Sequence, residues 1–393
     1  MKKIFYSLLV AVASVSFISC SSNNDEPEPN PNPNPDPDSP TETTINNFVV
    51  LNRGSKDNKI NGSLSYFTYD GNLLNTTLTA FEDKDDSSLG VNPNAMAVYD
   101  NKLFVCINEA NRIDIIDMDT KQKVNQITFE DQKFQHPRQI WIDEDKAYIS
   151  MYDDGSEVSV SGGYVVQYDC KTLEMLQYLP VGKYCNKPDG IVVVGNFLYI
   201  AYNKNLAIED GFEDGTTVIR LDKRTDWLSA PEDQREPITV GLNPTDIVTN
   251  GTEIFVLCEG DGVKTRSQIW KITDNYVGKF FVEGSMMKVD GKYLYVINNP
   301  KNGVSPITYK RYSVVDPNDV TDMIDPEDGV EYPTSLAIDN ETGNIIIGSA
   351  VVKDGVVSNT SNGYVNVYSK EGKKLVSGET GIDPFDILVL PKK

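Results

Sequence analysis

Among the residue types able to do acid-base chemistry, this chain has 58 acidic residues but only one histidine. With His136 as the only histidine, a Ser-His-Asp triad could be built in one place only, and a metal site made of several histidines cannot be built. Carboxylate pairs are plentiful, but in a chain this acidic they are weak indications of acid-base catalysis. They are Asp153 with Asp154, Glu209 with Asp210, and Glu213 with Asp214. We therefore expect no catalytic residue.

Two acidic segments offer a different chemistry. DDGSE at 153–157 and EDGFEDG at 209–215 carry oxygen ligands that Ca²⁺ accepts, although neither fits the EF-hand spacing. Apart from Cys20, four cysteines are present without metal or redox spacing, and Cys106 and Cys258 fall inside apolar strand patterns, where cysteine behaves as a small hydrophobe. Calcium remains an open alternative, and no cofactor is required.

A sequence repeat covers most of the chain, so any functional site must be positioned by the structure that this repeat forms. The tetrad Pro-x-x-apolar begins at Pro93, Pro137, Pro188, Pro244, Pro333 and Pro384, and a seventh copy has Gly284 in place of the proline. The copies are 40 to 56 residues apart, close to the length of a four-stranded propeller blade and too long for leucine-rich coils. After each tetrad come a turn, a second apolar strand, a variable loop, a third strand and a weaker fourth.

The two ends of this repeat complement each other. The last copy stops after one strand, DILVLP at 386–391, whereas FVVLN at 48–52 is a second strand without a first. Residues 62–80 then supply a third and a fourth strand. The sequence therefore predicts an all-β, seven-bladed β-propeller over residues 45–393, with four antiparallel strands per blade and the last blade closed by N- and C-terminal strands.

Loop length identifies one face of this propeller. The connections between second and third strands are long and irregular, as in NRGSKDNKING at 52–62, YNKNLAIEDGFEDG at 202–215 and AVVKDGVVSNTSNG at 350–363, whereas the opposite connections are mostly tight turns. Long loops on a rigid scaffold are where binding residues concentrate. The predicted ligand-binding face contains Arg53, Asn94, Asn108, His136, Arg138, Tyr152, Tyr184, Asp189, Tyr202, Asn203, Asp246, Glu259, Asn298, Tyr332 and Thr334. Solvated loop residues and turn formers are the alternative interpretation.

The first 44 residues are expected to lie outside the propeller. Residues 1–19 carry Lys2 and Lys3 before an apolar stretch, and Cys20 completes a lipobox directly after them. This pattern predicts a lipoprotein signal peptide and lipidation of Cys20. An ordinary cleaved signal is the alternative. Residues 20–44 form an acidic, proline-rich segment that cannot bury a core, so we expect a disordered tether. The pair Asp25 and Glu26 resembles the signal that sends Bacteroidetes lipoproteins to the outer face of the outer membrane.

The charge of the chain excludes one class of partner. The formal net charge is −22, and removing residues 1–19, which hold two lysines and no acidic residue, takes it to −24. Nucleic acid is therefore not an expected partner, because its binding requires a basic surface.

The whole body resembles the YncE-like propellers, through copies such as VNPNAMAVYDNKLFVCINEANRIDIIDMDTKQKV at 91–124 and LNPTDIVTNGTEIFVLCEGD at 242–261. Together with the lipobox and the acidic tether, it is similar to the BtuG lipoproteins of gut Bacteroidetes. That resemblance implies a surface-exposed, lipid-anchored protein of the outer membrane, which captures cobalamin (vitamin B12) or another corrinoid and passes it to a TonB-dependent transporter. A propeller enzyme of lactonase or lyase type and a ligand-free interaction scaffold remain open alternatives.

Overall fold

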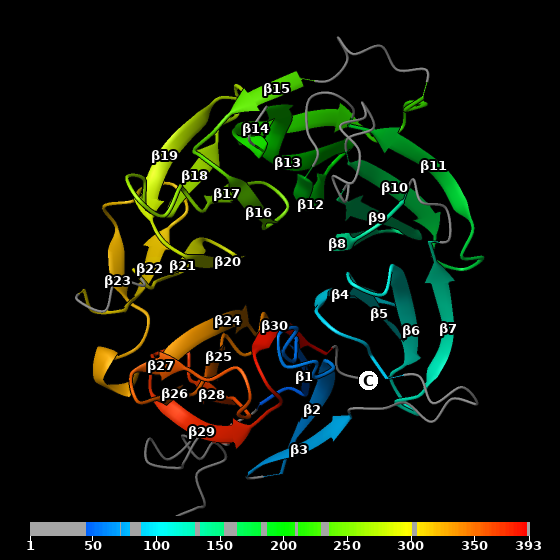
Figure 1. Ribbon diagram of the computed structural model, residues 1–393. Coiled ribbons are helices and arrows are strands. Elements are labelled where there is room, and N and C mark those ends of the chain that lie inside the picture. The colour runs from blue at the N-terminus through cyan, green and yellow to red at the C-terminus, as the bar shows by residue number, and fades with distance from the viewer. Residues whose placement is uncertain are drawn as a thin grey trace, which may run out of the picture. The chain divides into compact units, whose positions relative to one another are not determined.

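The computed structural model describes residues 45–70, 72–78, 88–129, 134–152, 163–181, 187–208, 211–228, 236–300 and 305–390. All of these residues belong to one compact unit, Thr44–Lys393. Its described part contains seven four-stranded antiparallel sheets, and Figure 1 shows them arranged as blades around a common centre. The predicted seven-bladed all-β propeller is therefore confirmed.

The blades are numbered here in chain order, and the strands of each are given from the centre outward. Blade 1 contains β4 (Pro93–Tyr99), β5 (Lys102–Ile107), β6 (Arg112–Asp117) and β7 (Lys123–Thr128). Blade 2 contains β8 (Pro137–Asp143), β9 (Lys146–Met151), β10 (Tyr164–Asp169) and β11 (Met175–Pro180). Blade 3 contains β12 (Lys187–Val194), β13 (Phe197–Ile208), β14 (Gly211–Asp222) and β15 (Glu236–Thr239).

Blade 4 contains β16 (Pro244–Thr249), β17 (Ile254–Cys258), β18 (Gln268–Ile272) and β19 (Gly278–Glu283). Blade 5 contains β20 (Met286–Asp290), β21 (Tyr293–Asn298), β22 (Thr308–Ser313) and β23 (Val320–Asp322), followed by a 3-10 turn, η3 (Pro326–Asp328). Blade 6 contains β24 (Tyr332–Ile338), β25 (Ile345–Ala350), β28 (Tyr364–Tyr368) and β29 (Lys374–Glu379), with a short hairpin of β26 (Val352–Lys353) and β27 (Val356–Val357). Blade 7 contains β30 (Pro384–Val389), β1 (Phe48–Asn52), β2 (Ser63–Tyr69) and β3 (Leu73–Leu78).

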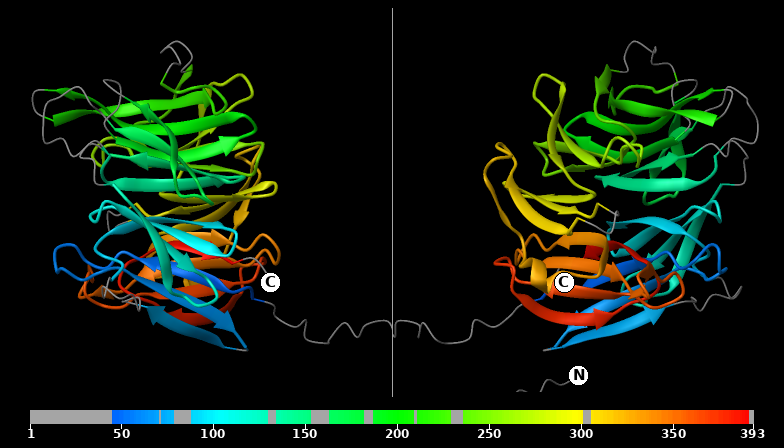
Figure 2. Two further views of the ribbon diagram at one scale, coloured as in Figure 1. Left: turned by 90° about the vertical axis from the view of Figure 1, so that its right-hand side faces the viewer. Right: turned by 60° about the vertical axis from the view of Figure 1, so that its left-hand side comes forward.

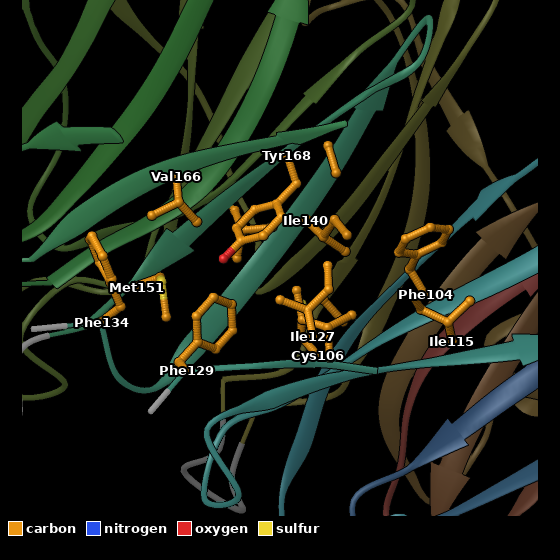
Figure 3. Packing of buried hydrophobic residues seen from close by; sticks show 14 of the residues in the cluster. Phe104, Cys106, Ile115, Ile127, Phe129, Phe134, Ile140, Met151, Val166 and Tyr168 are labelled. Carbon is orange, nitrogen blue, oxygen red and sulfur yellow. The ribbon is translucent and has the colours of Figure 1, made fainter. Parts of the chain in front are cut away.

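The core lies between neighbouring blades, because each sheet packs both of its faces against another sheet. Second strands are consequently buried along most of their length: every residue of β1 and of β17 is buried, whereas most of the outer strand β7 is exposed. Figure 2 shows the sheets face to face from the side. Figure 3 shows one interface, where Phe104 and Cys106 of blade 1 belong to the same cluster as Ile140 and Met151 of blade 2. The predicted apolar role of Cys106 is thereby confirmed.

Ring closure takes place as the two termini predict. β1 pairs with β30 on one edge and with β2 on the other, in registers that set Phe48 opposite Val389 and opposite Phe67. A buried polar network reinforces this junction. The Asn52 amide donates to Ser63 Oγ at 3.0 Å and to Ser65 Oγ at 2.9 Å, and its oxygen accepts from Thr380 Oγ1 at 2.8 Å. The network joins β1 and β2 to the chain that leaves β29.

Three details differ from the sequence prediction. The segment expected to be an irregular loop after Tyr202 continues both strands as a long hairpin, with β13 ending at Ile208 and β14 beginning at Gly211. The loop after Ala350 contains the β26–β27 hairpin. For the third strand of blade 5 the sequence predicts RYSVVD at 311–316, but the strand runs three residues earlier, over Thr308–Ser313. Within the described ranges no helix has the length and apolar character needed to cross a membrane.

Candidate functional site

The centre of the ring contains a cavity of about 840 Å³. All seven inner strands line it. Arg53, Tyr152 and Glu259, which follow second strands, and Asn203 of second strand β13 contribute to the same wall. These second-strand ends lead into the long loops, and we call the end of the cavity beside them its mouth. The cavity thus reaches the predicted face of the propeller.

A repeated irregularity aims side chains into the cavity. In each of the six blades with a tetrad proline, the register between the first two strands shifts next to that proline, as between Pro93 and Ala95. Blade 5, which has Gly284 in that position, begins its inner strand at Met286 without a shift. A bulge bends its strand and redirects a side chain. The residues that follow the prolines all line the cavity: Asn94, Arg138, Asp189, Thr245, Thr334 and Phe385.

A second local device fixes the mouth. Four residues that precede a tetrad proline have left-handed backbone, namely Asn92, His136, Asn243 and Asp383, with φ between 51° and 58°. Asn, Asp and His tolerate this conformation better than most residues. The carbonyls of three of them accept the backbone N–H of a second-strand exit: His136 from Tyr152 at 3.2 Å, Asn243 from Glu259 at 2.9 Å, and Asp383 from Arg53 at 3.0 Å. His136 therefore serves as a turn residue that holds Tyr152 at the mouth.

One charged cluster joins blades 2 and 3 across the mouth. The Tyr152 hydroxyl donates to Asp189 Oδ2 at 2.5 Å, and Arg138 Nε lies 3.6 Å from Asp189 Oδ1. The Arg138 guanidinium also lies over the Tyr152 ring, 4.7 Å from its centroid. Burial, reinforced by the Asp189 charge, raises the pKa of Tyr152 well above its ordinary value. Burial lowers the pKa of Arg138, but Asp189 and Tyr152 raise it by more, so the guanidinium stays charged.

A similar cluster belongs to blade 7. Arg53 Nε lies 2.7 Å from Asp383 Oδ2, and its guanidinium lies 3.9 Å from the centroid of the Phe385 ring. Each cluster combines an arginine, an aspartate that balances its charge, and an aromatic ring. The mouth therefore presents aromatic planes and polar groups with little net charge from these two pairs.

Further from the mouth, Asp246 of β16, Asp386 of β30 and Lys288 of β20 line the same cavity. Burial raises the pKa of Asp246 to about 6; Lys288 lowers it, and the charges of Asp189 and Asp386 raise it. Burial raises the pKa of Asp386 as well. Near neutral pH, the Asp246 carboxylate is thus held in its charged form against an unfavourable environment.

We expect Asp246→Asn to stabilise the protein at pH 7 by about 2 kcal/mol, because two pKa units correspond to about 3 kcal/mol and water in the cavity reduces the effect. The folded-state pKa lies above the ordinary 3.8, so the folded protein binds this proton more tightly than the unfolded chain. The wild type should lose stability relative to Asp246→Asn as pH rises from about 4 to about 6. Urea denaturation at a series of pH values measures this difference.

The control is Asp57→Asn, at an exposed turn outside the cavity. Its free energy of unfolding should stay within about 0.5 kcal/mol of the wild type across the same range. A pH-independent difference between Asp246→Asn and the wild type would contradict the assignment.

The structure brings together ten of the predicted face residues around the cavity: Arg53, Asn94, Arg138, Tyr152, Asp189, Asn203, Asp246, Glu259, Tyr332 and Thr334. Two of them also make contacts that position their neighbours. Asn203 Nδ2 lies 3.4 Å from Asp189 Oδ2, and Thr334 Oγ1 donates to the Pro384 carbonyl at 2.6 Å, which links blade 6 to blade 7.

The remaining predicted residues lie elsewhere. Tyr202 differs most from expectation, because only 2% of it is exposed and it packs in the core between blades 2 and 3. Asn108 is buried outside the cavity lining, and His136 and Asn298 are half-buried outside it. Tyr184 lies outside the described residues.

Sequence reasoning missed other residues of the lining, above all Lys288, Asp383, Phe385 and Asp386. The tetrad itself carried a usable signal for three of these, because Asp383 precedes Pro384 and the other two follow it. Lys288 belongs to the blade that lacks the proline, so no tetrad marked it.

Of the two candidate calcium segments, 153–157 and residues 209–210 lie outside the described residues, and Asp214 is the one acidic residue of the two segments whose side chain is described. Within the part of the chain that the structure describes, no group of three or more His, Cys, Asp or Glu side chains is arranged to hold a metal ion.

No protein-family model matches the chain, and no curated protein matches it in sequence. Solved structures match in fold. A hypothetical selenium-binding protein from Sulfolobus tokodaii has 12% identity and a TM-score of 0.59, over 87% of this chain and 92% of that one. A functionally unknown protein from Desulfotomaculum acetoxidans has 13% identity and a TM-score of 0.57, over 89% and 100%. A quinonprotein alcohol dehydrogenase-like protein from Bacteroides thetaiotaomicron has 14% identity and a TM-score of 0.52, over 84% of each chain. At these identities the likeness establishes the propeller fold alone.

Proposed function

We propose that this propeller is a cell-surface binding protein for a corrinoid, most specifically cobalamin, and that it delivers this ligand to a TonB-dependent transporter of the outer membrane. In this proposal Cys20 carries the lipid anchor, residues 20–44 are the tether, and the cavity mouth receives the ligand. No catalytic step is assigned to any residue, His136 included.

One observation carries the binding part of the proposal: polar atoms at the mouth are buried without hydrogen-bond partners among the described residues. These atoms are Oδ1 and Nδ2 of Asn94, Nε of Arg138 and Oδ1 of Asp189. Arg138 and Asp189 face each other, but their 3.6 Å separation is too long for a hydrogen bond. Buried polar atoms left unpaired destabilise a fold by about 1–3 kcal/mol each. A polar ligand that completes these bonds is a physical reason for keeping them.

The shape of the site favours a broad ligand over a small one. The cavity of about 840 Å³ opens among Tyr152, Tyr332 and Phe385, whose rings offer apolar planes beside polar groups. A corrinoid is a nearly neutral disc fringed with amides. Such a disc can lie across the mouth while individual side groups enter the cavity, which suits aromatic, amide and balanced charged residues. The lipobox, the acidic tether and the seven repeats resemble those of the BtuG lipoproteins, and this resemblance is a second reason for proposing a corrinoid.

Calorimetric titration of cyanocobalamin into the purified protein tests the proposal. We expect a dissociation constant of micromolar or tighter, and absence of binding at micromolar ligand would refute it. Tyr332→Ala removes one aromatic plane of the mouth and is expected to weaken binding by about tenfold, which corresponds to about 1.4 kcal/mol. Phe280→Ala is the matched control, because Phe280 is an aromatic residue on outer strand β19 with 52% of its surface exposed. It should bind as the wild type does.

The transporter requires a separate experiment. Affinity purification of the tagged protein from the outer membrane of its own cells should recover a TonB-dependent transporter. Recovery of the transporter by a protein that takes up no corrinoid would favour an interaction scaffold instead.

A further inference from the structure

Asn94 differs from the other buried asparagines that the structure describes in that both polar atoms of its amide lack a hydrogen-bond partner. It follows Pro93 in the bulge of β4, lines the cavity, and has only 2% of its surface exposed. Neither its amide oxygen nor its amide nitrogen has a hydrogen-bond partner among the described residues. By contrast, the buried Asn243 donates to the Gly260 carbonyl at 2.7 Å, and the buried Asn366 donates to the Tyr368 hydroxyl at 3.0 Å. Buried amides are normally paired in this way.

The surroundings of Asn94 are balanced in charge. Its strand β4 lies between the inner strands of blade 7 and blade 2 (Figure 1). On the blade 7 side stands the Arg53–Asp383 ion pair, and on the blade 2 side Arg138 is paired with Asp189 of blade 3. A ligand anion at this position would be repelled by the carboxylates of the two pairs, and a ligand cation would be repelled by their guanidiniums. The position therefore favours an uncharged polar group.

The chemistry of the free amide narrows that group further. A side-chain amide presents a donor and an acceptor side by side in one plane. A carboxylate can only accept and an ammonium can only donate, so each would leave half of Asn94 unpaired. A primary carboxamide presents the same two functions in reverse order and satisfies both in one coplanar pair.

From this geometry we infer that Asn94 is the specificity-determining residue of a subsite that takes a primary carboxamide into the propeller cavity. The inference deepens the proposed function, because a corrinoid carries several such groups at its rim. It names which residue reads the amide and explains why a buried, unpaired side chain is retained at this position.

Ligand-observed saturation-transfer NMR tests the subsite without a corrinoid. The probes are propionamide, propionate and propylammonium at millimolar concentration, each added to the purified wild type, Asn94→Leu and Asn94→Asp. We expect saturation transfer to propionamide with the wild type, loss of that transfer with both variants, and none to propionate with the wild type. Asn362→Leu is the matched control, because Asn362 is exposed and pairs with Glu379 outside the cavity. It should retain the propionamide signal.

Two further measurements separate this subsite from the proposed function. Asn94→Leu should unfold at a denaturant concentration equal to or above that of the wild type, since it removes unpaired buried atoms, and should bind cyanocobalamin at least tenfold more weakly.

Cobalamin binding that is unchanged in Asn94→Leu, with no Asn94-dependent propionamide signal, would overturn the subsite and leave the corrinoid proposal standing. An Asn94-dependent propionamide signal without cobalamin binding would support the subsite and refute the corrinoid. Asn94→Asp also controls for unfolding: if this variant is folded and shows no saturation transfer to propionamide, the loss of transfer is not caused by unfolding. A propionamide signal that persists in folded Asn94→Asp overturns the inference.

Discussion

Gly190→Ala is expected to destabilise the protein by about 3 kcal/mol, the upper part of the range for overpacking a core. Gly190 lies in inner strand β12 against inner strand β16 of the next blade. A Cβ placed on it would come within 2.7 Å of Asp246 Cα and of Ile247 N, both backbone atoms. No side-chain rotation relieves such a contact, so the two inner strands must separate. Because Asp189 and Asp246 flank this contact, ligand binding should weaken together with stability. Chemical denaturation and cobalamin titration measure the two effects.

Gly195→Ala is the matched control for this substitution. Gly195 lies in the turn between β12 and β13 with φ at 58°, and a Cβ there would meet no atom within 4 Å. Only left-handed strain applies, so the expected cost is about 1 kcal/mol with unchanged ligand binding. Equal costs for the two substitutions would show that close packing at the centre of the ring is not what requires Gly190.

The second large effect is expected at the closure of the ring. Asn52→Ala should lower the free energy of unfolding by about 3 kcal/mol, because the amide is fully buried and its removal leaves several buried hydroxyls without it. Ser63, Ser65 and Thr380 would lose their shared partner. Since the network ties β1 to the chain before β30, the loss should also increase susceptibility to proteolysis at the N-terminal strand. Denaturation curves and limited proteolysis measure the two consequences.

A double-mutant cycle distinguishes the network from simple loss of volume. Thr380→Val removes the hydroxyl and keeps the shape of the side chain, so Asn52→Ala combined with Thr380→Val should cost clearly less than the sum of the two. Asn362→Ala, an exposed asparagine that donates to Glu379 Oε1 at 2.9 Å, should change stability by less than about 0.5 kcal/mol. Strict additivity of the pair would contradict the role given to Asn52.

Much of the fold could be predicted because each blade repeats the same local signals. Proline ends the preceding segment, and the apolar residue three positions later is buried in the inner strand, so the tetrads mark six inner strands directly. Blade 7 was predicted from its ends because FVVLN and DILVLP each lacked a partner. The third strand of blade 5 was predicted too late in the sequence because Val314 and Val315 make RYSVVD look more strand-like, whereas the more polar TYKRYS is the segment that pairs with β21.

The candidate site was partly predictable for the same reason. Residues next to a tetrad proline reach the cavity through a shared bulge, which any copy of the motif indicates. Tyr202 could not be assigned in this way, because alternation along a strand covered on both faces does not tell which neighbour a side chain meets. Pairing across blades is also hidden: Arg53 and Asp383 are 330 positions apart and adjacent only in the closed ring. The unpaired state of Asn94 depends on what surrounds it, and no sequence pattern carries that information.

The pairing of β1 with β30 also orders events in time. The first described strand can find its partner only after the last residues of the chain have been synthesised, so the ring cannot close on a growing chain. Contacts between such distant segments form slowly, and until then β1 and the inner strands leave edges that other chains can join. We therefore expect refolding of the protein to be slow and sensitive to concentration, with six blades able to form early and the seventh completing the native state.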